Sequence, residues 1–303
     1  MARPQVIALF GPTGVGKTTL AIALAQRLRE LGHDPVAVSA DALQVYRGLE
    51  ILTGAADRAE RAQLEHRLLS FLPVDAQFSA GQYAQLAHSE IDGLLAAGRL
   101  PIVVGGTGLY LRAALAELSL KPPPAPGVRE RWIEELRLRG PEALHRVLAQ
   151  RAPEAAARIV PTDSHRIIRA LELDEAGELE PEPEQSELWT ESTRRPTLLI
   201  GVVKEREELY RRIESRVDAM LAAGVVEEVR RAHAAGASET ARKALGFDEV
   251  LTGDIEAMKR RTRNYARRQL TWMRKLPGVR VIDLSVESVE AAARTVAEQW
   301  LDG

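Results

Sequence analysis

The stretch GPTGVGKTT at residues 11–19 fits the phosphate-loop pattern G-x-x-x-x-G-K-[ST] in full. The short apolar run PQVIALF precedes it and the amphipathic run TTLAIALAQRLREL follows it, so the loop is predicted to join a strand to a helix. Backbone N–H groups and the helix N-terminus can then surround phosphate oxygens, which makes a chance glycine-rich turn the weaker interpretation. The predicted phosphate-binding residues are Gly11, Pro12, Thr13, Gly14, Val15, Gly16, Lys17 and Thr18.

Two side chains of this loop have separate predicted roles. Lys17 is expected to reach the outer phosphate of the ligand, and the hydroxyl of Thr18 is expected to hold Mg²⁺. The pattern says that phosphates bind here but not which ligand carries them, because hydrolases, kinases and other phosphate-handling enzymes share the loop.

Further along the chain, helix-length segments alternate with short apolar runs. PVAVSAD follows the first helix, which Gly32 ends, and a helical stretch at 79–97 leads into the continuous apolar run RLPIVVGG. This alternation predicts an α/β core with a parallel sheet, of the doubly wound kind found in phosphate-loop kinases.

The α/β pattern is interrupted after KPPPAPG at residues 121–127, where three consecutive prolines indicate a stiff connector. Residues 128–173 look entirely helical, and the α/β pattern returns at RPTLLIGVV and ends in a short strand at VRVIDL. We therefore predict a core formed by 1–120 and 195–303, with a helical insertion at 121–194. Residues 170–193 contain no Lys or Arg, which favours a solvated loop there.

The composition limits the classes of function. With 303 residues, 45% of them hydrophobic and 28% charged, the chain is typical of globular proteins. It has no cysteine, which excludes disulfides and thiolate metal sites, and its six histidines are scattered without metal-ligand spacing. No apolar run approaches the ~20 residues of a membrane helix, so no membrane association is expected, and the absence of cysteine fits a cytoplasmic protein.

A nucleoside triphosphate hydrolase normally carries a metal-binding Asp at a strand end, and the run LPIVV ends instead in Gly105-Gly106-Thr107-Gly108. Asp283 follows the closing strand, which is an improbable place for that metal. Asp41, in SADALQVYRG, stands at a strand end near the phosphate loop. It could bind metal through water or accept a proton, or it could cap the next helix, and the spacing does not decide between these roles.

The charge distribution points to a nucleic acid although the net charge is only −2. Residues 259–280 contain nine Lys or Arg and no acid, and Arg260, Arg263, Arg267 and Arg274 share a helix face. Such a face is expected at an RNA or DNA backbone, the alternative being a solvated basic helix. Arg212 and Arg216 also share a helix face, and periodicity alone favours ordinary surface charges for them.

Several separated segments together resemble the tRNA dimethylallyltransferase family. They are GPTGVGKT, SADALQVYRG, PIVVGGTGLYLRAAL with the following VRERW, PTDSHRIIRALEL, RIESRVDAML, KALGFDEV and TRNYARRQLTWMR, in this order over about residues 5–280. The resemblance implies transfer of a dimethylallyl group from dimethylallyl diphosphate to N6 of the adenine immediately 3′ of the anticodon in tRNA. The phosphate loop would then hold the diphosphate of the prenyl donor.

The resemblance also implies the roles of particular residues. Lys17 and Thr18 would bind diphosphate and Mg²⁺, Arg216 would neutralise the leaving group, and Thr107 would lie near the released oxygen. Asp41 would accept the proton of the adenine amine. The implied tRNA-binding residues are Asp41, Ala42, Leu43, Gln44, Thr107, Arg129, His165, Arg166, Ile167, Ile168 and Arg169, and the basic helix adds Arg263 and Arg267. No obligate protein partner is implied.

One segment departs from the family pattern, and three other functions compete. After YRG the family usually continues with a stretch like MDIGTAKP, where this chain has LEILTGAAD at 49–57 and lacks a glycine and a lysine. A metabolite kinase would need no basic helix, and a non-catalytic RNA-binding ATPase would leave Asp41 and Thr107 without a role. A prenyltransferase acting on free nucleotide would need neither the insertion nor the basic helix.

Overall fold

The computed structural model describes residues 3–180 and 187–303. The chain divides into two compact units at Leu118/Ser119 and at Glu187/Leu188. Residues 188–194, expected in the insertion, therefore belong to the larger unit. Trp189 packs there against Trp272 with ring centroids 4.5 Å apart, and Arg194 pairs with Asp92 at 3.0 Å.

The larger unit is built on one six-stranded sheet with the order β3-β2-β4-β1-β5-β6, in which every pair of neighbours is parallel. The strands are β1 Val6–Phe10, β2 Pro35–Ser39, β3 His66–Arg67, β4 Leu100–Gly105, β5 Thr197–Val203 and β6 Arg280–Asp283. The predicted α/β class and parallel sheet are confirmed. The two-residue strand β3 was not predicted, because so short a segment carries no periodic pattern.

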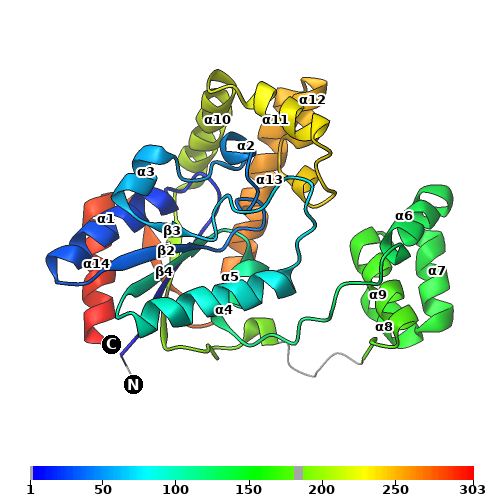
Figure 1. Ribbon diagram of the computed structural model, residues 1–303, viewed down its shortest axis with the longest axis horizontal. Helices are drawn as coiled ribbons and strands as arrows, with labels where there is room; N and C mark the ends of the chain where they lie inside the picture. Colours follow the sequence, from blue (N-terminus) through cyan, green and yellow to red (C-terminus); the bar gives the residue numbers. More distant parts are fainter. Residues whose placement is uncertain (1–2, 181–186) are drawn as a thin grey trace. The chain divides into compact units, whose positions relative to one another are not determined.

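Helices follow the strands of this unit on both faces (Figure 1). They are α1 Lys17–Glu30, α2 Glu50–Thr53, α3 Arg58–Gln63, α4 Ala80–Ala96, α5 Gly108–Leu115, α10 Arg206–Ala222, α11 Val225–Ala234, α12 Phe247–Thr252, α13 Ile255–Met273 and α14 Val289–Asp302. Short 3₁₀ turns lie at Glu187–Trp189 and Ala241–Lys243. No helix among the described residues is both long and apolar enough to span a membrane.

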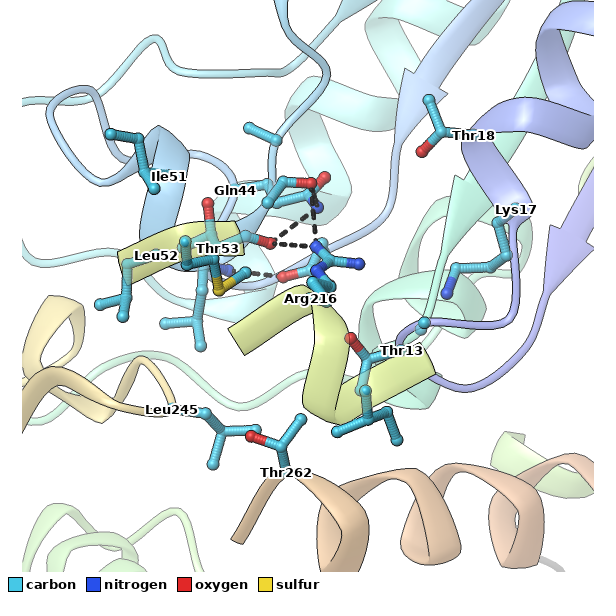
Figure 2. A pocket seen from close by; sticks show the side chains of 18 of the residues that line it. Thr13, Lys17, Thr18, Gln44, Ile51, Leu52, Thr53, Arg216, Leu245 and Thr262 are labelled. Carbon is cyan, nitrogen blue, oxygen red and sulfur yellow. Dashed lines mark hydrogen bonds between the residues drawn. The ribbon is translucent and has the colours of Figure 1, made fainter. Parts of the chain in front are cut away.

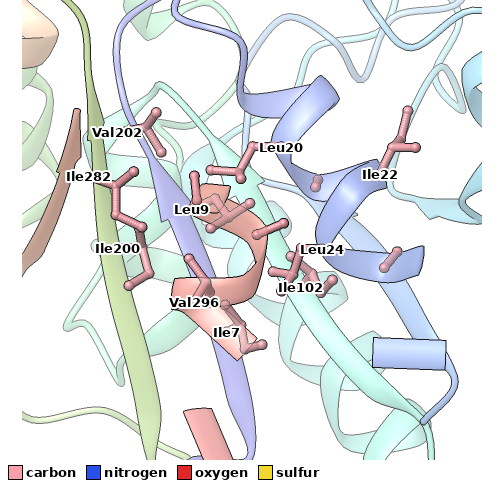
Figure 3. Close-up of a cluster of buried hydrophobic side chains, with 14 of the residues drawn as sticks. Ile7, Leu9, Leu20, Ile22, Leu24, Ile102, Ile200, Val202, Ile282 and Val296 are labelled. Carbon is pink, nitrogen blue, oxygen red and sulfur yellow. The ribbon is translucent and has the colours of Figure 1, made fainter. Parts of the chain in front are cut away.

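The side chains of β1 alternate between two buried layers. Ile7 and Leu9 pack with Leu20 and Leu24 of α1 and with Val296 of α14 (Figure 3). Their neighbours point to the opposite face, where α4 and α5 contact the sheet. Burial on both faces explains why the strands read as continuous apolar runs.

The order of the strands determines where a site can form. The chain leaves β1 toward β2 and β4 on one side of it, and later adds β5 and β6 on the other side. In sheets of this kind, ligands bind beyond the carboxyl ends of the strands, near the point where the order reverses. The loops after β1, β2 and β4 meet at that edge.

The smaller unit is entirely helical over the part of it that the structure describes, as predicted. It contains α6 Val128–Arg139, α7 Pro141–Arg151, α8 Pro153–Arg158 and α9 Ser164–Ala176. Its core is formed by Trp132, Leu144, Leu148, Ile167 and Leu171 with their neighbours.

The prediction of a solvated loop over residues 170–193 is wrong for its first part, where α9 continues to Ala176. The reason is Glu172, whose side chain is fully buried and accepts hydrogen bonds from two arginines. Arg129 donates to both carboxylate oxygens at 2.7 and 2.9 Å, and Arg169 donates to one at 3.1 Å. An acid that the sequence predicts to be solvated is thus buried and paired with two arginines. Residues 181–186 of the acidic stretch lie outside the described residues.

We expect Glu172→Gln to destabilise the smaller unit, because an amide replaces the charge that both arginines share. The loss should be about 2 kcal/mol, as for a hydrogen bond to a charged group, since both guanidinium groups are partly solvated. Thermal and urea unfolding of the full chain measure it. Glu154→Gln, at an exposed acid of α8, is the matched control. Equal stability of the two variants would contradict a structural role for Glu172.

Candidate active site

A cavity of about 790 Å³ lies at the carboxyl edge of the sheet. The phosphate loop, the ends of β2 and β4, helix α2, helix α10 and helix α13 all contribute to its wall. Lys17 and Thr18 point toward this space from α1, Gln44 from the turn after β2, and Arg216 from α10 (Figure 2). Asp41 also lines it, so residues that are far apart in the sequence meet at one place.

Lys17, the first residue of α1, turns back over the phosphate loop. Its ammonium donates to the carbonyl oxygens of Gly11 and Pro12, both at 2.9 Å. Burial lowers the pKa of Lys17 to about 8; the negative charge of Asp41 partly opposes this effect, and the positive charge of Arg216 adds to it. The loop therefore holds a cation that neutral carbonyls solvate only in part, and an anion would stabilise it.

The amide of Gln269, on α13, joins the phosphate loop to the turn after β4. Its Oε1 accepts from the backbone N–H of Thr13 at 2.8 Å, and its Nε2 donates to the carbonyl of Gly106 at 2.8 Å. Gln269 was not among the residues predicted from the sequence. A signal was present, because Gln269 lies four residues after Tyr265 and three before Trp272, and so faces inward with them.

Asp41 does not cap a helix. Its Oδ1 accepts from the backbone N–H of Leu43 at 3.0 Å within a turn, and the next helix, α2, begins only at Glu50. The helix-cap interpretation of this residue is therefore wrong. The carboxylate lines the cavity, where it can act on a ligand.

Thr107 comes close to the Asp41 turn from the neighbouring strand. Its hydroxyl accepts from the backbone N–H of Ala42 at 3.4 Å and shares a hydrogen bond with the Tyr265 hydroxyl at 3.3 Å. Burial raises the pKa of Tyr265 to about 12, so this hydroxyl stays protonated at neutral pH. Thr107 takes the N-cap position of α5 without making a side-chain cap, which leaves its hydroxyl to these two partners.

Arg216 is not the surface charge that periodicity favoured. It lies on α10, partly buried, and its Nη2 donates to the carbonyls of Thr53 and Gly54 at 3.3 and 3.2 Å. Gln44 donates to the same two carbonyls (Figure 2). Arg212, one turn earlier, is exposed and donates to the carbonyl of Gly14 at 3.0 Å. Both arginines thus lie at the phosphate site, because α10 packs with this face toward the cavity.

The segment that departs from the family pattern forms α2 and its C-terminal cap, Gly54. The backbone of Gly54 has φ +57°, and a Cβ atom there would lie 1.5 Å from Nη2 of Arg216. Glycine therefore lets the guanidinium lie directly against the end of α2. Leu52 lines the cavity with its neighbours.

The basic helix α13 is divided between packing and exposure. Its first half pairs with acids of α10 and α12 through Lys259–Asp218, Arg261–Glu249 and Arg263–Glu214. Arg260, Arg267, Arg268 and Arg274 are exposed, and Arg267 also donates to Asn264. The opposite face packs so closely on the turn after β4 that a Cβ atom at Gly108 would lie 2.2 Å from the Trp272 ring.

The predicted RNA-contacting residues of the smaller unit have unlike environments. In HRIIR, the side chains of Ile167 and Ile168 are buried in the helical core, whereas His165 and Arg166 are exposed. Arg169 is partly exposed and, like Arg129, pairs with Glu172. The packing of the helices decides which of these side chains are buried and which are exposed, and the motif alone did not reveal it.

The donor set at the cavity fits a hard divalent cation that also binds the ligand. Among residues 3–180 and 187–303, no cluster of three or more His, Cys, Asp or Glu could hold a metal by itself. Thr18 and Asp41 offer a hydroxyl and a carboxylate beside the phosphate loop. Mg²⁺ typically uses one or two protein oxygens, several waters and phosphate oxygens, which is the arrangement these residues allow.

Comparisons with known proteins identify relatives over almost the whole chain. The family model described as IPP transferase matches residues 44–276. The tRNA dimethylallyltransferase of Kineococcus radiotolerans is 42% identical over 293 residues, which are 92% of this chain and 91% of that protein. The enzyme of the same name from Streptomyces coelicolor is 44% identical over 91% of this chain and 89% of its own length.

Solved structures agree with this assignment. The full-length tRNA isopentenylpyrophosphate transferase of Bacillus halodurans superposes with a TM-score of 0.70 at 30% identity, over 99% of this chain and 98% of that one. A eukaryotic dimethylallyltransferase studied while acting on tRNA superposes with a TM-score of 0.74 over 98% of this chain and 79% of its own. At 24% identity, this second likeness concerns the fold alone.

The lowered pKa of Lys17 predicts how diphosphate binding depends on pH. Below pH 8 the ammonium is charged in the free protein; above pH 8 it loses its proton there, so binding an anion requires that the proton be taken up again. The affinity for inorganic diphosphate should therefore fall as pH rises through about 8, by up to about tenfold for each pH unit.

Calorimetric titration at pH 7 to 10, compared with Lys17→Arg, measures this dependence. The ligand's own ionisation is common to both proteins, and arginine stays charged over this range. The steeper fall should occur only in the wild type. Parallel profiles for the two proteins would show that Lys17 does not carry the dependence.

Proposed function

The chain belongs to the IPP transferase family, and we propose that it transfers a dimethylallyl group from dimethylallyl diphosphate to tRNA. The acceptor is N6 of the adenine immediately 3′ of the anticodon, and diphosphate is released. The observation that carries this proposal is that Asp41 lines the same cavity as a cationic phosphate loop, with the Thr107 hydroxyl bonded to the Asp41 turn. A proton acceptor and an anion site are thereby adjacent.

The phosphate loop would hold the diphosphate of the prenyl donor. Its backbone N–H groups and the start of α1 attract the anion, and Lys17, Thr18 and Arg216 surround the same space. As the allylic carbon–oxygen bond breaks, negative charge grows on the diphosphate. Lys17 and Arg216 can stabilise that charge because both are cations in a partly dry site. Mg²⁺, held by Thr18 and the diphosphate, would supply further Lewis-acid neutralisation.

The acceptor side would use Asp41 and Thr107. The exocyclic amine is a poor nucleophile, so holding it in line with the allylic carbon supplies much of the rate. When the nitrogen attacks, the new C–N bond replaces the C–O bond, and Asp41 takes the proton that the amine loses. Thr107 lies beside the Asp41 turn, where its hydroxyl can donate to the oxygen that leaves.

The prenyl group is compatible with the rest of the cavity wall. Leu52, Met220, Leu245 and Met258 line it together with the polar groups already described. An apolar surface of this kind can hold a five-carbon chain away from water. It also keeps water from competing with the amine for the allylic carbon.

The anticodon stem-loop would be bound by the exposed basic groups and by the turn after β2. Ala42, Leu43 and Gln44 follow Asp41 in the chain, and Leu43 and Gln44 line the cavity. These three residues would contact the target nucleotide after it leaves its stack. Arg267 of α13, with His165 and Arg166 of the smaller unit, would contact phosphates. Arg129, Arg166, Arg169 and Arg263 pair with acids, so each would have to share its guanidinium between an acid and the RNA. Such a substrate implies a cytoplasmic enzyme.

A two-tube assay tests the proposal. One tube contains protein, Mg²⁺, labelled dimethylallyl diphosphate and an anticodon stem-loop with an unmodified adenine, and the other contains the same RNA with labelled ATP and no prenyl donor. Label that reaches RNA only in the first tube supports the prenyltransferase. ATP consumption without prenyl transfer would favour a kinase or an ATPase instead.

Asp41→Asn should lower the transfer rate by about a hundredfold or more, because an amide cannot accept the amine proton. Its oxygen can still accept from the N–H of Leu43, so the turn and the affinity for the donor should be kept. Single-turnover transfer and calorimetry with the donor measure the two effects separately.

The matched control is Asp283→Asn. Asp283 also ends a strand and accepts from the backbone N–H two residues later, at 2.8 Å, but it lies on β6 away from the cavity lining. Normal turnover by Asp41→Asn would mean that Asp41 only stabilises its turn and does not accept the amine proton.

A further inference from the structure

Glu228 of α11 is a buried acid that the mechanism above does not use. It is 4% exposed, and its two carboxylate oxygens accept from the backbone N–H groups of Ile51 and Leu52, both at 2.8 Å. Burial raises its pKa, and the hydrogen bonds from these two N–H groups partly oppose that shift. A buried carboxylate is costly unless its oxygens are satisfied, and here one short segment satisfies both.

That segment is α2, a helix of four residues. A helix this short cannot hold its own geometry in water, so its position depends on contacts from outside. Glu228 receives the N–H groups at the start of α2. At the other end, the carbonyls of Thr53 and Gly54 accept from the guanidinium of Arg216 and from the amide of Gln44.

The charges at the two ends of α2 match the polarity of the helix. Unpaired N–H groups at a helix start attract an anion, and unpaired carbonyls at its end attract a cation. Glu228 and Arg216 provide these charges at the two ends of α2, from the consecutive helices α11 and α10. Each charge is thereby bound to backbone groups of the same short element.

We propose that Glu228 is a positioning residue for Arg216, acting through α2, and this inference rests on the proposed function. Its carboxylate fixes the start of α2, and α2 in turn presents the carbonyls of Thr53 and Gly54 that hold the guanidinium at the cavity. Both bonds are made by Nη2. The other guanidinium nitrogens can therefore face a diphosphate while Nη2 of Arg216 stays hydrogen-bonded to the end of α2.

A purely structural role for Glu228 is the competing explanation, and a double-mutant cycle distinguishes the two. Glu228→Gln keeps the shape of the side chain but places an amide against one of the two N–H groups. It is measured alone and together with Arg216→Ala, as full-length protein. The readouts are the kcat and KM of prenyl transfer, the Kd for inorganic diphosphate with Mg²⁺, and the melting temperature.

If Glu228 acts through Arg216, Glu228→Gln should lower kcat and weaken diphosphate binding by about tenfold, the scale of a lost charged hydrogen bond. In the Arg216→Ala background the same substitution should change either quantity by less than about twofold. Glu227→Gln is the matched control, because Glu227 is the preceding residue of α11 and is exposed beside Arg230. It should leave both quantities unchanged.

Equal fold-losses in the two backgrounds would overturn the inference, because Glu228 would then act independently of Arg216. If Glu228→Gln does not fold, Glu228→Asp replaces it in the cycle, since it keeps the charge but is too short to hold both N–H groups. The diphosphate affinities measure the coupling between Glu228 and Arg216 even if the wild type transfers no prenyl group. Absence of wild-type transfer would contradict the proposed function, whereas additive diphosphate affinities would contradict the role of Glu228.

Discussion

The close packing of α13 on the turn after β4 is the constraint on which the rest of the site depends. The Gln269 amide bonds to the phosphate loop with its oxygen and to Gly106 with its nitrogen. The glycines of the turn leave room for this approach, and Tyr265 reaches Thr107 from the same helix face. One helix thus fixes the distance between the anion site and the strand ends that carry Asp41 and Thr107. It also carries exposed arginines on its other face.

The cations at the reaction site differ from those elsewhere in the kind of group that they bond to. Within the described residues, Lys17 and Arg216 bond to backbone carbonyls, whereas Arg129 and Arg263 pair with carboxylates. A carboxylate neutralises a cation before any ligand arrives, but a carbonyl dipole orients it and leaves its net charge in place. Such cations remain available to an anionic leaving group. The nearby Asp41 carboxylate helps Lys17 to keep its proton, since its attraction partly opposes the lowering of the pKa of Lys17 by burial.

Some features of this protein could be predicted from its sequence and others could not. The phosphate loop, the alternation of helices and strands, and the position of Asp41 at a strand end could all be predicted, because each depends on neighbouring residues. The burial of Glu172 and the position of Arg216 could not, because both depend on partners from distant segments. Periodicity describes a helix face but not what packs against it. Gln269 was missed for the same reason, although its inward spacing was visible.

The sequence by itself determined the fold class, the phosphate loop and the family, since local pattern and motif order suffice for these. Only the tertiary structure decided which charges serve the cavity and which serve the fold. It separated Arg216 from surface arginines, excluded the helix cap at Asp41, and joined Glu228 to Arg216 through α2. The physical reason is that the effect of a charge depends on its burial and its partners, and packing between distant segments sets both.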